Sequence, residues 1–115
     1  MEIYSKKVGD ITVLTINGDI DASIVNQLRS LLNKSIDIGD KKIIIDFDKV
    51  SYIDSGGVGL LISIKAKIES VKGLLILVNV KDNNRKVFEL TNLLNFFIIL
   101  DSIEDAIGKI KNAVG

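Results

Sequence analysis

The residues best suited to chemistry are Asp54 and Ser55, which precede three closely spaced glycines in the stretch YIDSGGVGLL. The apolar run that follows is typical of a helix, so Ser55 falls near a helix start. Such a start offers free N–H groups and a partial positive charge, which favour an anion. A serine there can carry a phosphate at little structural cost, and bare glycines would leave its hydroxyl open to an incoming active site. One interpretation of the stretch is therefore a phosphoacceptor at Ser55.

Three other interpretations of this stretch stay open. Asp54 or Ser55 could serve only as the N-cap of the helix, because Asp and Ser are preferred caps. A nucleotide-binding loop would explain the glycines, but the sequence contains neither G-x-x-x-x-G-K-[ST] nor G-x-G-x-x-G. An enzyme could use Ser55 as a nucleophile with help from Asp54. The motif holds no His or Lys that would activate the hydroxyl, so we expect no catalytic activity.

Aspartates follow several predicted strands and could gather at one end of a sheet. GDIDAS places Asp19 and Asp21 directly after a strand, and Asp46, Asp48 and Asp54 come later. Carboxylates that converge in this way can hold Mg²⁺. Caps and turns explain Asp21, Asp46 and Asp48 more simply, so we expect neither a metal site nor a cofactor.

Composition excludes several classes of function. The 115 residues are 47% hydrophobic, carry 15 basic and 15 acidic side chains, and include no Cys or His. Disulfides, a Ser-His-Asp triad and a His-ligated zinc site are therefore excluded. Basic residues are not clustered, so we expect no nucleic-acid partner. The apolar runs are too short to cross a bilayer and the first residues do not form a signal peptide, so we expect a cytoplasmic protein with no membrane partner.

Hydrophobic periodicity predicts strands that alternate with helices after an opening hairpin around Gly9 and Asp10. Strands are expected at 2–8, 11–18, 41–47, 74–80 and 96–100, and helices at 21–37, 57–73, 83–94 and 103–114. Residues 48–55 are interpreted as a connector. The buried helix faces are expected to comprise Ile24, Leu28, Leu31 and Leu32, then Val58, Leu61, Ile64 and Ile68, then Val87, Leu90 and Leu94, and finally Ile103, Ala106, Ile107, Ile110 and Val114.

The order of these elements is β-β-α-β-α-β-α-β-α, and it predicts an α/β fold. Alternation implies parallel strands joined by right-handed crossovers, while the opening hairpin adds an antiparallel pair. The length suits a single domain over residues 1–115. Asp21 or Ser23 can cap the first helix, Gly73 can end the second, and Ser102 with Asp105 forms a capping pattern for the last. The apolar segment FELTNLLNFFIIL is interpreted as core rather than as a partner groove.

At these residues the chain resembles the anti-sigma factor antagonists, or anti-anti-sigma factors, which are small STAS domains. LTINGDIDASIVNQLRSLL resembles the strand, acidic loop and first helix of that family. IIIDFDKVSYIDSGGVGLL resembles its central signature, and RKVFELTNLLNFFIILDSIEDAI resembles its C-terminal third. The resemblance covers essentially the whole chain. It implies a STAS-type mixed β-sheet, with an N-terminal hairpin followed by parallel β-α-β crossovers, and about four helices.

The resemblance also implies a function for Ser55. In this family a partner kinase, which is itself the anti-sigma factor, phosphorylates a serine at the start of the second helix. The unphosphorylated protein would bind that anti-sigma factor and release the sigma factor, the phosphorylated protein would let go, and a phosphatase would reset the switch. The implied partner surface comprises Asp19, Asp21, Asp54, Ser55, Gly56 and Gly57.

The sequence departs from the family pattern at two places, and a second role is known for STAS domains. Gly56 stands where many members have a second Ser or Thr, which could weaken the fit to the kinase. Asn92 and Leu93 stand where a Thr-Gly-Leu triplet is common, so that helix end could differ in shape. STAS domains also act as scaffolds in stress-signalling assemblies or as accessory subunits of transport systems, and that role stays open for this chain.

Overall fold

Runs of Ile, Leu and Val form the buried strands of one mixed sheet, and amphipathic segments form the helices that cover it. The computed structural model describes the backbone of residues 2–114 and the side chains of residues 2–112. In chain order, the elements are β1 (Glu2–Val8), β2 (Ile11–Ile20), α1 (Ala22–Asp37), β3 (Lys42–Asp46), β4 (Val50–Ile53), α2 (Ser55–Ser70), β5 (Leu74–Val78), α3 (Asp82–Leu90), β6 (Ile98–Leu100) and α4 (Ile103–Val114).

The sheet has the strand order β1-β2-β3-β5-β6, with β4 paired to the far end of β2. β1 and β2 form the predicted antiparallel hairpin, in which Val8 pairs with Ile11. Gly9 makes this tight turn with a φ of +61°, a value that suits glycine. The remaining neighbours pair in parallel, as expected for strands joined by helices. The predicted α/β fold with a mixed sheet is therefore confirmed.

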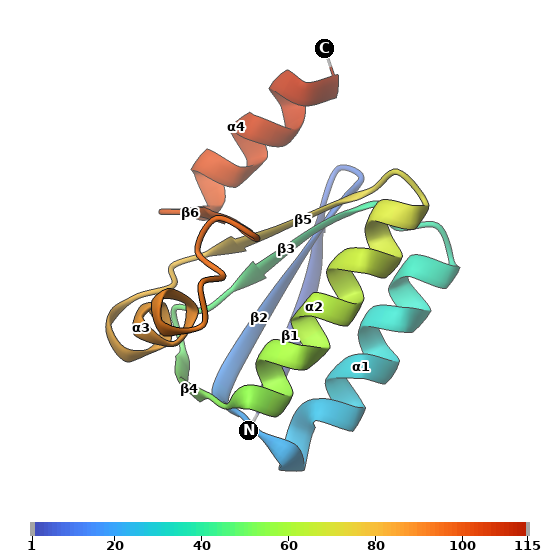
Figure 1. Ribbon diagram of the computed structural model, residues 1–115. Coiled ribbons are helices and arrows are strands. Elements are labelled where there is room, and N and C mark those ends of the chain that lie inside the picture. Colours follow the sequence, from blue (N-terminus) through green and yellow to red (C-terminus); the bar gives the residue numbers. More distant parts are fainter. Residues whose placement is uncertain (1, 115) are drawn as a thin grey trace.

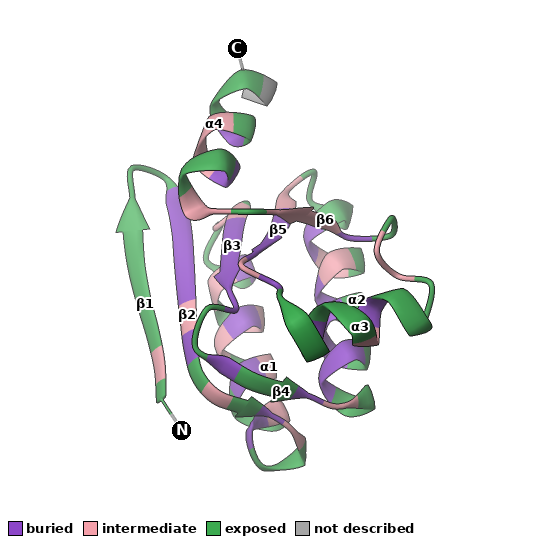
Figure 2. Cartoon of the chain, turned by 90° about the vertical axis from the view of Figure 1, so that its left-hand side faces the viewer, coloured by how far each residue is buried: buried purple, intermediate pink, exposed green. Residues whose placement is uncertain are grey.

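Helices cover the two faces of the sheet unequally. α1 and α2 lie side by side on one face, and α4 lies on the other (Figure 1). Alternation along each strand directs every second side chain to each face, so two separate apolar clusters form. Figure 2 shows that β2 and β3 are largely buried, whereas β1 at the edge of the sheet is largely exposed. The larger cluster joins the sheet to α1 and α2. The smaller cluster holds α4 and comprises Ile11, Val13, Ile44, Ile76, Val78, Ala106 and Ile110.

The connector predicted for residues 48–55 is wrong, because β4 (Val50–Ile53) lies within it. β2 is longer than β3, and β4 pairs with Gly18, Asp19 and Ile20 at the end of β2, where a bulge between Gly18 and Asp19 shifts the register. β4 has only four residues, of which the middle two are exposed. Its sequence VSYI therefore has neither the length nor the regular alternation that identifies a strand.

The inward face predicted for α3 is also wrong in part. Leu90 is 78% exposed, whereas Phe88 and the polar Asn84 are buried. A helix turns by about 100° per residue, so Leu90 lies about 200° around from Phe88. Leu94 lies beyond the helix end. The Asn84 side chain donates a hydrogen bond of 2.9 Å to the carbonyl of Val50 and thereby ties α3 to β4.

The predicted faces of the other helices are confirmed where the structure describes them, with Leu31, Ile103 and Ile107 only partly buried at the edges of the two clusters. The buried positions include Ile24, Leu28 and Leu32 in α1, Val58, Leu61, Ile64 and Ile68 in α2, and Ala106 and Ile110 in α4. Asp21 caps α1, and the backbone N–H of Asp105 donates to the Ser102 hydroxyl at the start of α4. The side chain of Val114 lies outside the described residues.

Three helices end in the same Schellman arrangement, with a left-handed residue after the cap. Gly39, Lys72 and Asn92 hold this position after α1, α2 and α3, with φ values of +107°, +61° and +59°. Asn tolerates the left-handed region, so Asn92 substitutes for the glycine that is common there and keeps the shape of the helix end. Gly73 therefore does not supply the left-handed residue of α2. It is needed because a Cβ at this position would lie 2.6 Å from the Lys41 carbonyl oxygen.

Replacing the left-handed lysine should stabilise the protein. Lys72→Gly removes the steric cost of a side chain at positive φ, and we expect the free energy of unfolding to rise by about 0.5–1 kcal/mol. Gly73→Ala, one residue later, should instead lower it because of the contact with the Lys41 carbonyl. Urea unfolding of both variants checks this pair, and a destabilised Lys72→Gly would contradict the assignment of the left-handed position.

Asp40 should give the fold a pH-dependent contribution to stability. Lys7 Nζ lies 2.7 Å from its carboxylate and the Ser35 hydroxyl donates to it at 2.5 Å, and these contacts lower the pKa of Asp40. The stabilisation is therefore complete above the unfolded-state pKa of about 3.9 and is lost as the pH falls through the lower folded-state pKa. Asp40→Asn should be less stable than the native chain at neutral pH, with the difference shrinking in acid. A difference independent of pH in urea unfolding would contradict this.

Candidate functional site

Asp54 begins helix α2 and holds Ser55 at its first position. The Asp54 carboxylate accepts a hydrogen bond of 2.9 Å from the N–H of Gly57, and the Asp54 carbonyl accepts one of 3.0 Å from the N–H of Val58. The capping interpretation is thus confirmed for Asp54 and not for Ser55. Ser55 is exposed at the helix start, so its side chain is accessible from outside.

Parallel pairing between β2 and β4 brings the acidic loop beside this helix start. Asp19 pairs with Tyr52 and Ile20 pairs with Ile53. The N–H of Asp54 then donates a hydrogen bond of 3.1 Å to the carbonyl of Ile20. The segment that holds Asp19 and Asp21 therefore lies alongside the segment that holds Asp54 and Ser55, although the two are far apart in the sequence.

Gly57 allows the close contact between these two segments. A Cβ on Gly57 would lie 2.8 Å from the Ile20 carbonyl oxygen and equally close to side-chain carbons of Ile20 and Ile53. Real Cβ atoms do not approach a backbone oxygen so closely, so only glycine fits. Gly56 is exposed, and a Cβ there would lie 3.3 Å from the Asp54 carboxylate. Gly57 thus has a packing role, whereas Gly56 faces outward beside Ser55.

The two aspartates of the acidic loop have different surroundings. Asp21 caps α1, where its Oδ1 accepts hydrogen bonds from the hydroxyl of Ser23 at 2.5 Å and from the Ser23 N–H at 2.9 Å. Both bonds lower the pKa of Asp21 and keep its carboxylate ionised. Asp19 is exposed. Asp19, Asp21 and Asp54 take part in none of the ion pairs found among the described residues, so the site has an acidic surface.

The other aspartates do not join this site. Asp46 is buried and accepts hydrogen bonds from the N–H of Asp48 at 3.0 Å and from the amide of Asn79 at 2.9 Å. Asp48 lies 3.4 Å from the Lys81 ammonium group. No set of three His, Cys, Asp or Glu side chains within the described residues is grouped as a metal site would require. These carboxylates therefore act in turns and ion pairs.

The nucleotide-loop interpretation does not fit the local geometry. Only Asp54 separates β4 from α2, and Gly56, Gly57 and Gly59 all lie within the first two turns of α2. A phosphate-binding loop needs its glycines between the strand and the helix, where free N–H groups can surround the anion. The glycines here instead shape the surface of a helix.

Tyr52 is a candidate binding residue that the sequence analysis missed. Its side chain is 50% exposed, it pairs with Asp19, and it lies three residues before Ser55. Exposed tyrosines are common contact residues in protein interfaces. Tyr52 lies in the segment that was predicted to be a connector. Only the pairing of β4 with β2 places it beside the acidic loop.

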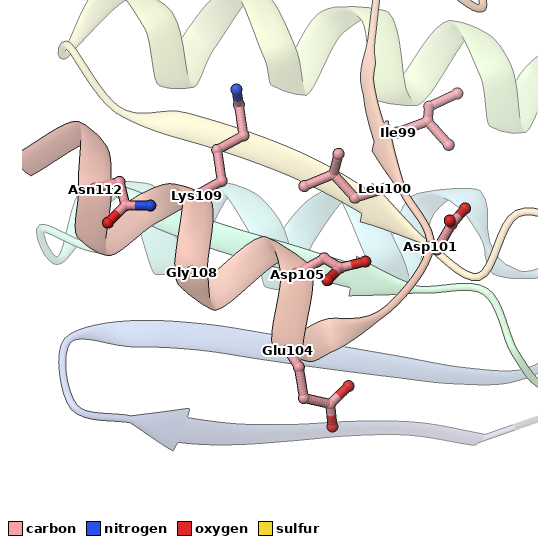
Figure 3. Close-up of a pocket in the computed structure, with 8 residues that line it drawn as sticks. All are labelled: Ile99, Leu100, Asp101, Glu104, Asp105, Gly108, Lys109 and Asn112. Atoms are coloured by element: carbon pink, nitrogen blue, oxygen red, sulfur yellow. The ribbon is translucent and has the colours of Figure 1, made fainter.

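A cavity of about 830 Å³ lies elsewhere, between β6 and α4 (Figure 3). None of the residues predicted for the site contributes to it. Its walls combine Leu100 and Asp101 with Asp105 and Lys109. The helix α4 that contributes to it lies on the opposite face of the sheet from α2 (Figure 1). The cavity is therefore distinct from the surface around Ser55.

Comparison with known proteins identifies the family. The family model of the STAS domain matches residues 2–106. The chain belongs to the STAS domain family. Within it, the chain groups with anti-sigma factor antagonists. It is 31% identical over 107 residues to the anti-sigma F factor antagonist of Lysinibacillus sphaericus, covering 91% of this chain and 90% of the relative. It is also 31% identical to the anti-sigma-B factor antagonist of Staphylococcus aureus, covering 90% and 88%.

Solved structures agree with this placement. The anti-sigma factor antagonist SpoIIAA in its unphosphorylated form is 29% identical, with a TM-score of 0.77 over 96% of this chain and 98% of that one. The Bacillus cell fate determinant SpoIIAA in its phosphorylated form is 30% identical, with a TM-score of 0.75 over 95% and 99%. The predicted membership in the STAS family is thus confirmed. Separately, none of the helices in the described residues has the length and apolarity needed to span a membrane.

Adding a methyl group to Gly57 should destabilise the whole site. Gly57→Ala forces the helix start away from Ile20, and overpacking of this kind costs about 2–3 kcal/mol. Gly56→Ala is the matched control, because its Cβ meets only the end of the Asp54 side chain and should cost far less. Urea unfolding measures both. Equal stabilities of the two variants would show that the contact with Ile20 does not constrain the helix.

Proposed function

We propose that this STAS protein is an anti-sigma factor antagonist controlled by phosphorylation of Ser55. In the unphosphorylated form it binds an anti-sigma factor that has serine kinase activity, and the sigma factor is released. Transfer of phosphate from ATP to the Ser55 hydroxyl ends the binding, and a phosphoserine phosphatase restores it. The protein acts by binding rather than by catalysis, and it does so in the cytoplasm.

The exposed position of Ser55 carries this proposal. Asp54 already caps α2, so the Ser55 hydroxyl is free to meet a kinase without loss of the cap. Gly56 beside it adds no side chain that would block access. The relative SpoIIAA is known in unphosphorylated and phosphorylated forms, which supports a phosphate switch on this fold.

The bulk of a phosphate on Ser55 and the cost of burying its charge explain how phosphorylation would end the binding. Asp19, Asp21 and Asp54 make the surface acidic, so a complementary partner presents positive charge to it. A phosphate adds about −1.5 to −2 charges at neutral pH. Because the phosphate lies at the contact itself, its bulk holds the partner away, and burying its charge beside the Asp54 carboxylate costs more desolvation than the attraction to basic residues of the partner returns. A loss of about 2.8 kcal/mol would weaken binding a hundredfold, which is enough for a switch.

Phosphate mapping and binding by Ser55 variants test the proposal. The protein purified from its source cells with phosphatases blocked should carry phosphate on Ser55, as mapped by peptide mass spectrometry. The anti-sigma factor kinases encoded in the same genome are then assayed by calorimetry with ADP or ATP. The native chain should bind one of them with ADP and lose binding after incubation with ATP. Ser55→Ala should bind in both cases, and Ser55→Glu should bind at least tenfold more weakly.

Ser70→Ala is the matched control, because Ser70 is an exposed serine at the opposite end of α2. This variant should still be phosphorylated and released. Phosphate that persists in Ser55→Ala, or equal affinity of the phosphorylated and unphosphorylated chains, would disprove the switch. A large stable assembly on gel filtration without any such kinase partner would favour a scaffold role instead.

A further inference from the structure

Gly59 has no packing role among the residues that the structure describes. It lies inside α2, where glycine is the poorest helix former apart from proline. Gly57 is required by the close approach of Ile20, but a Cβ on Gly59 would meet no atom within 4 Å. A larger residue would therefore fit and would favour the helix. No contact among the described residues therefore explains why position 59 is a glycine, which indicates a requirement imposed by a binding partner.

The first half of α2 also lacks charge. Charged residues make up 26% of the chain, yet none occurs from Ser55 to Ile64, and Lys65 is the first in the helix. The exposed residues of this half, which we call the uncharged α2 face, are Ser55, Gly56, Gly59, Ile62 and Ser63. Ile62 is a large apolar side chain that is 37% exposed. Depletion of charge on an exposed surface is the compositional mark of the centre of a protein interface.

These residues continue the surface proposed around the phosphoacceptor. Ser55, Gly59 and Ile62 are four and three residues apart, so they lie along one side of the helix. α2 lies on one face of the sheet with α1 beside it (Figure 1), and the segment after α3 flanks its second half, where the Lys65 ammonium group lies 4.8 Å from the centroid of the Phe96 ring. A partner that reaches Ser55 can therefore extend along the helix over Gly59 to Ile62.

We propose that the anti-sigma factor packs its main chain directly against α2 at Gly59 and an apolar side chain against Ile62. This inference rests on the proposed function, because the occupant is the partner that phosphorylates Ser55. An uncharged segment of the partner covers the uncharged α2 face, while its basic residues reach the exposed carboxylate of Asp19. Glycine serves at position 59 because a side chain there would hold the two main chains apart.

Gly108 provides a matched control within the same molecule. It also lies inside a helix, and a Cβ on it would likewise meet no atom within 4 Å. Unlike Gly59, it lies among charged neighbours, which are Glu104, Asp105, Lys109 and Lys111. Gly108→Gln should therefore raise helix stability as Gly59→Gln does but should leave partner binding unchanged.

The experiment compares Gly59→Ala, Gly59→Gln and Gly108→Gln with the native chain. Urea unfolding should show a higher midpoint for all three variants. Binding is measured by calorimetry, in ADP, to the kinase that phosphorylates Ser55 of the native chain, and the initial rate of Ser55 phosphorylation is measured with the same kinase. Gly59→Gln should weaken binding at least tenfold and slow phosphorylation, Gly59→Ala should weaken binding about threefold, and Gly108→Gln should stay within twofold of the native chain.

The outcomes separate this inference from the proposed function. Native affinity in Gly59→Gln would overturn the close approach at Gly59 and leave the phosphorylation switch intact. An equal loss of binding in Gly108→Gln would also overturn it, because the effect would not depend on the uncharged α2 face. A native chain that no anti-sigma factor kinase binds or phosphorylates would overturn the proposed function and this inference with it.

Discussion

The contact between the first turn of α2 and the end of β2 fixes the geometry of the site. The Ile20 carbonyl accepts the N–H of Asp54, and the absence of a side chain on Gly57 lets the helix reach that carbonyl. This approach joins two segments that are distant in the sequence, the acidic loop and the helix start. This contact determines where Ser55 lies on the surface and places it near Asp19. Glycine at position 57 lowers the intrinsic stability of the helix, but the contact with Ile20 that it permits stabilises the fold by more than this cost.

Most of the fold could be predicted because its signals are local and repeated. Three or four apolar positions per helix and unbroken apolar runs, such as the three isoleucines of β3 and the LLILV of β5, identify the elements and their order. The errors occurred where the deciding interaction is not local. β4 is a strand only because β2 extends beyond β3, and Lys72 is left-handed although its residue type disfavours that conformation. In α3, the buried Asn84 contradicts the usual rule that polar residues lie outside, because its partner is the Val50 carbonyl.

Apart from Tyr52, the residues of the candidate site were expected from the sequence, but the separate role of each was not. The pair Asp54-Ser55 before glycines indicated both a helix cap and a phosphoacceptor, and sequence could not separate the two. The hydrogen bond from Gly57 assigns the cap to Asp54, which leaves the Ser55 hydroxyl available. The three glycines likewise differ in role although they look alike in the sequence. Only the surroundings of each Cβ position distinguish Gly57, which is enclosed, from Gly59, which faces open space.

The two apolar clusters share no residue, so the core has two separate parts, one under α1 and α2 and the other under α4. Substitutions in the small cluster beneath α4 should combine additively with changes around Ser55, because distant sites without shared partners couple weakly. α4 and the start of α2 also lie at opposite ends of the molecule (Figure 1). A dye or a tether attached to the exposed Asn112 would therefore leave the α2 surface unobstructed. The C-terminal helix is thus a suitable attachment site for a label when binding at α2 is measured.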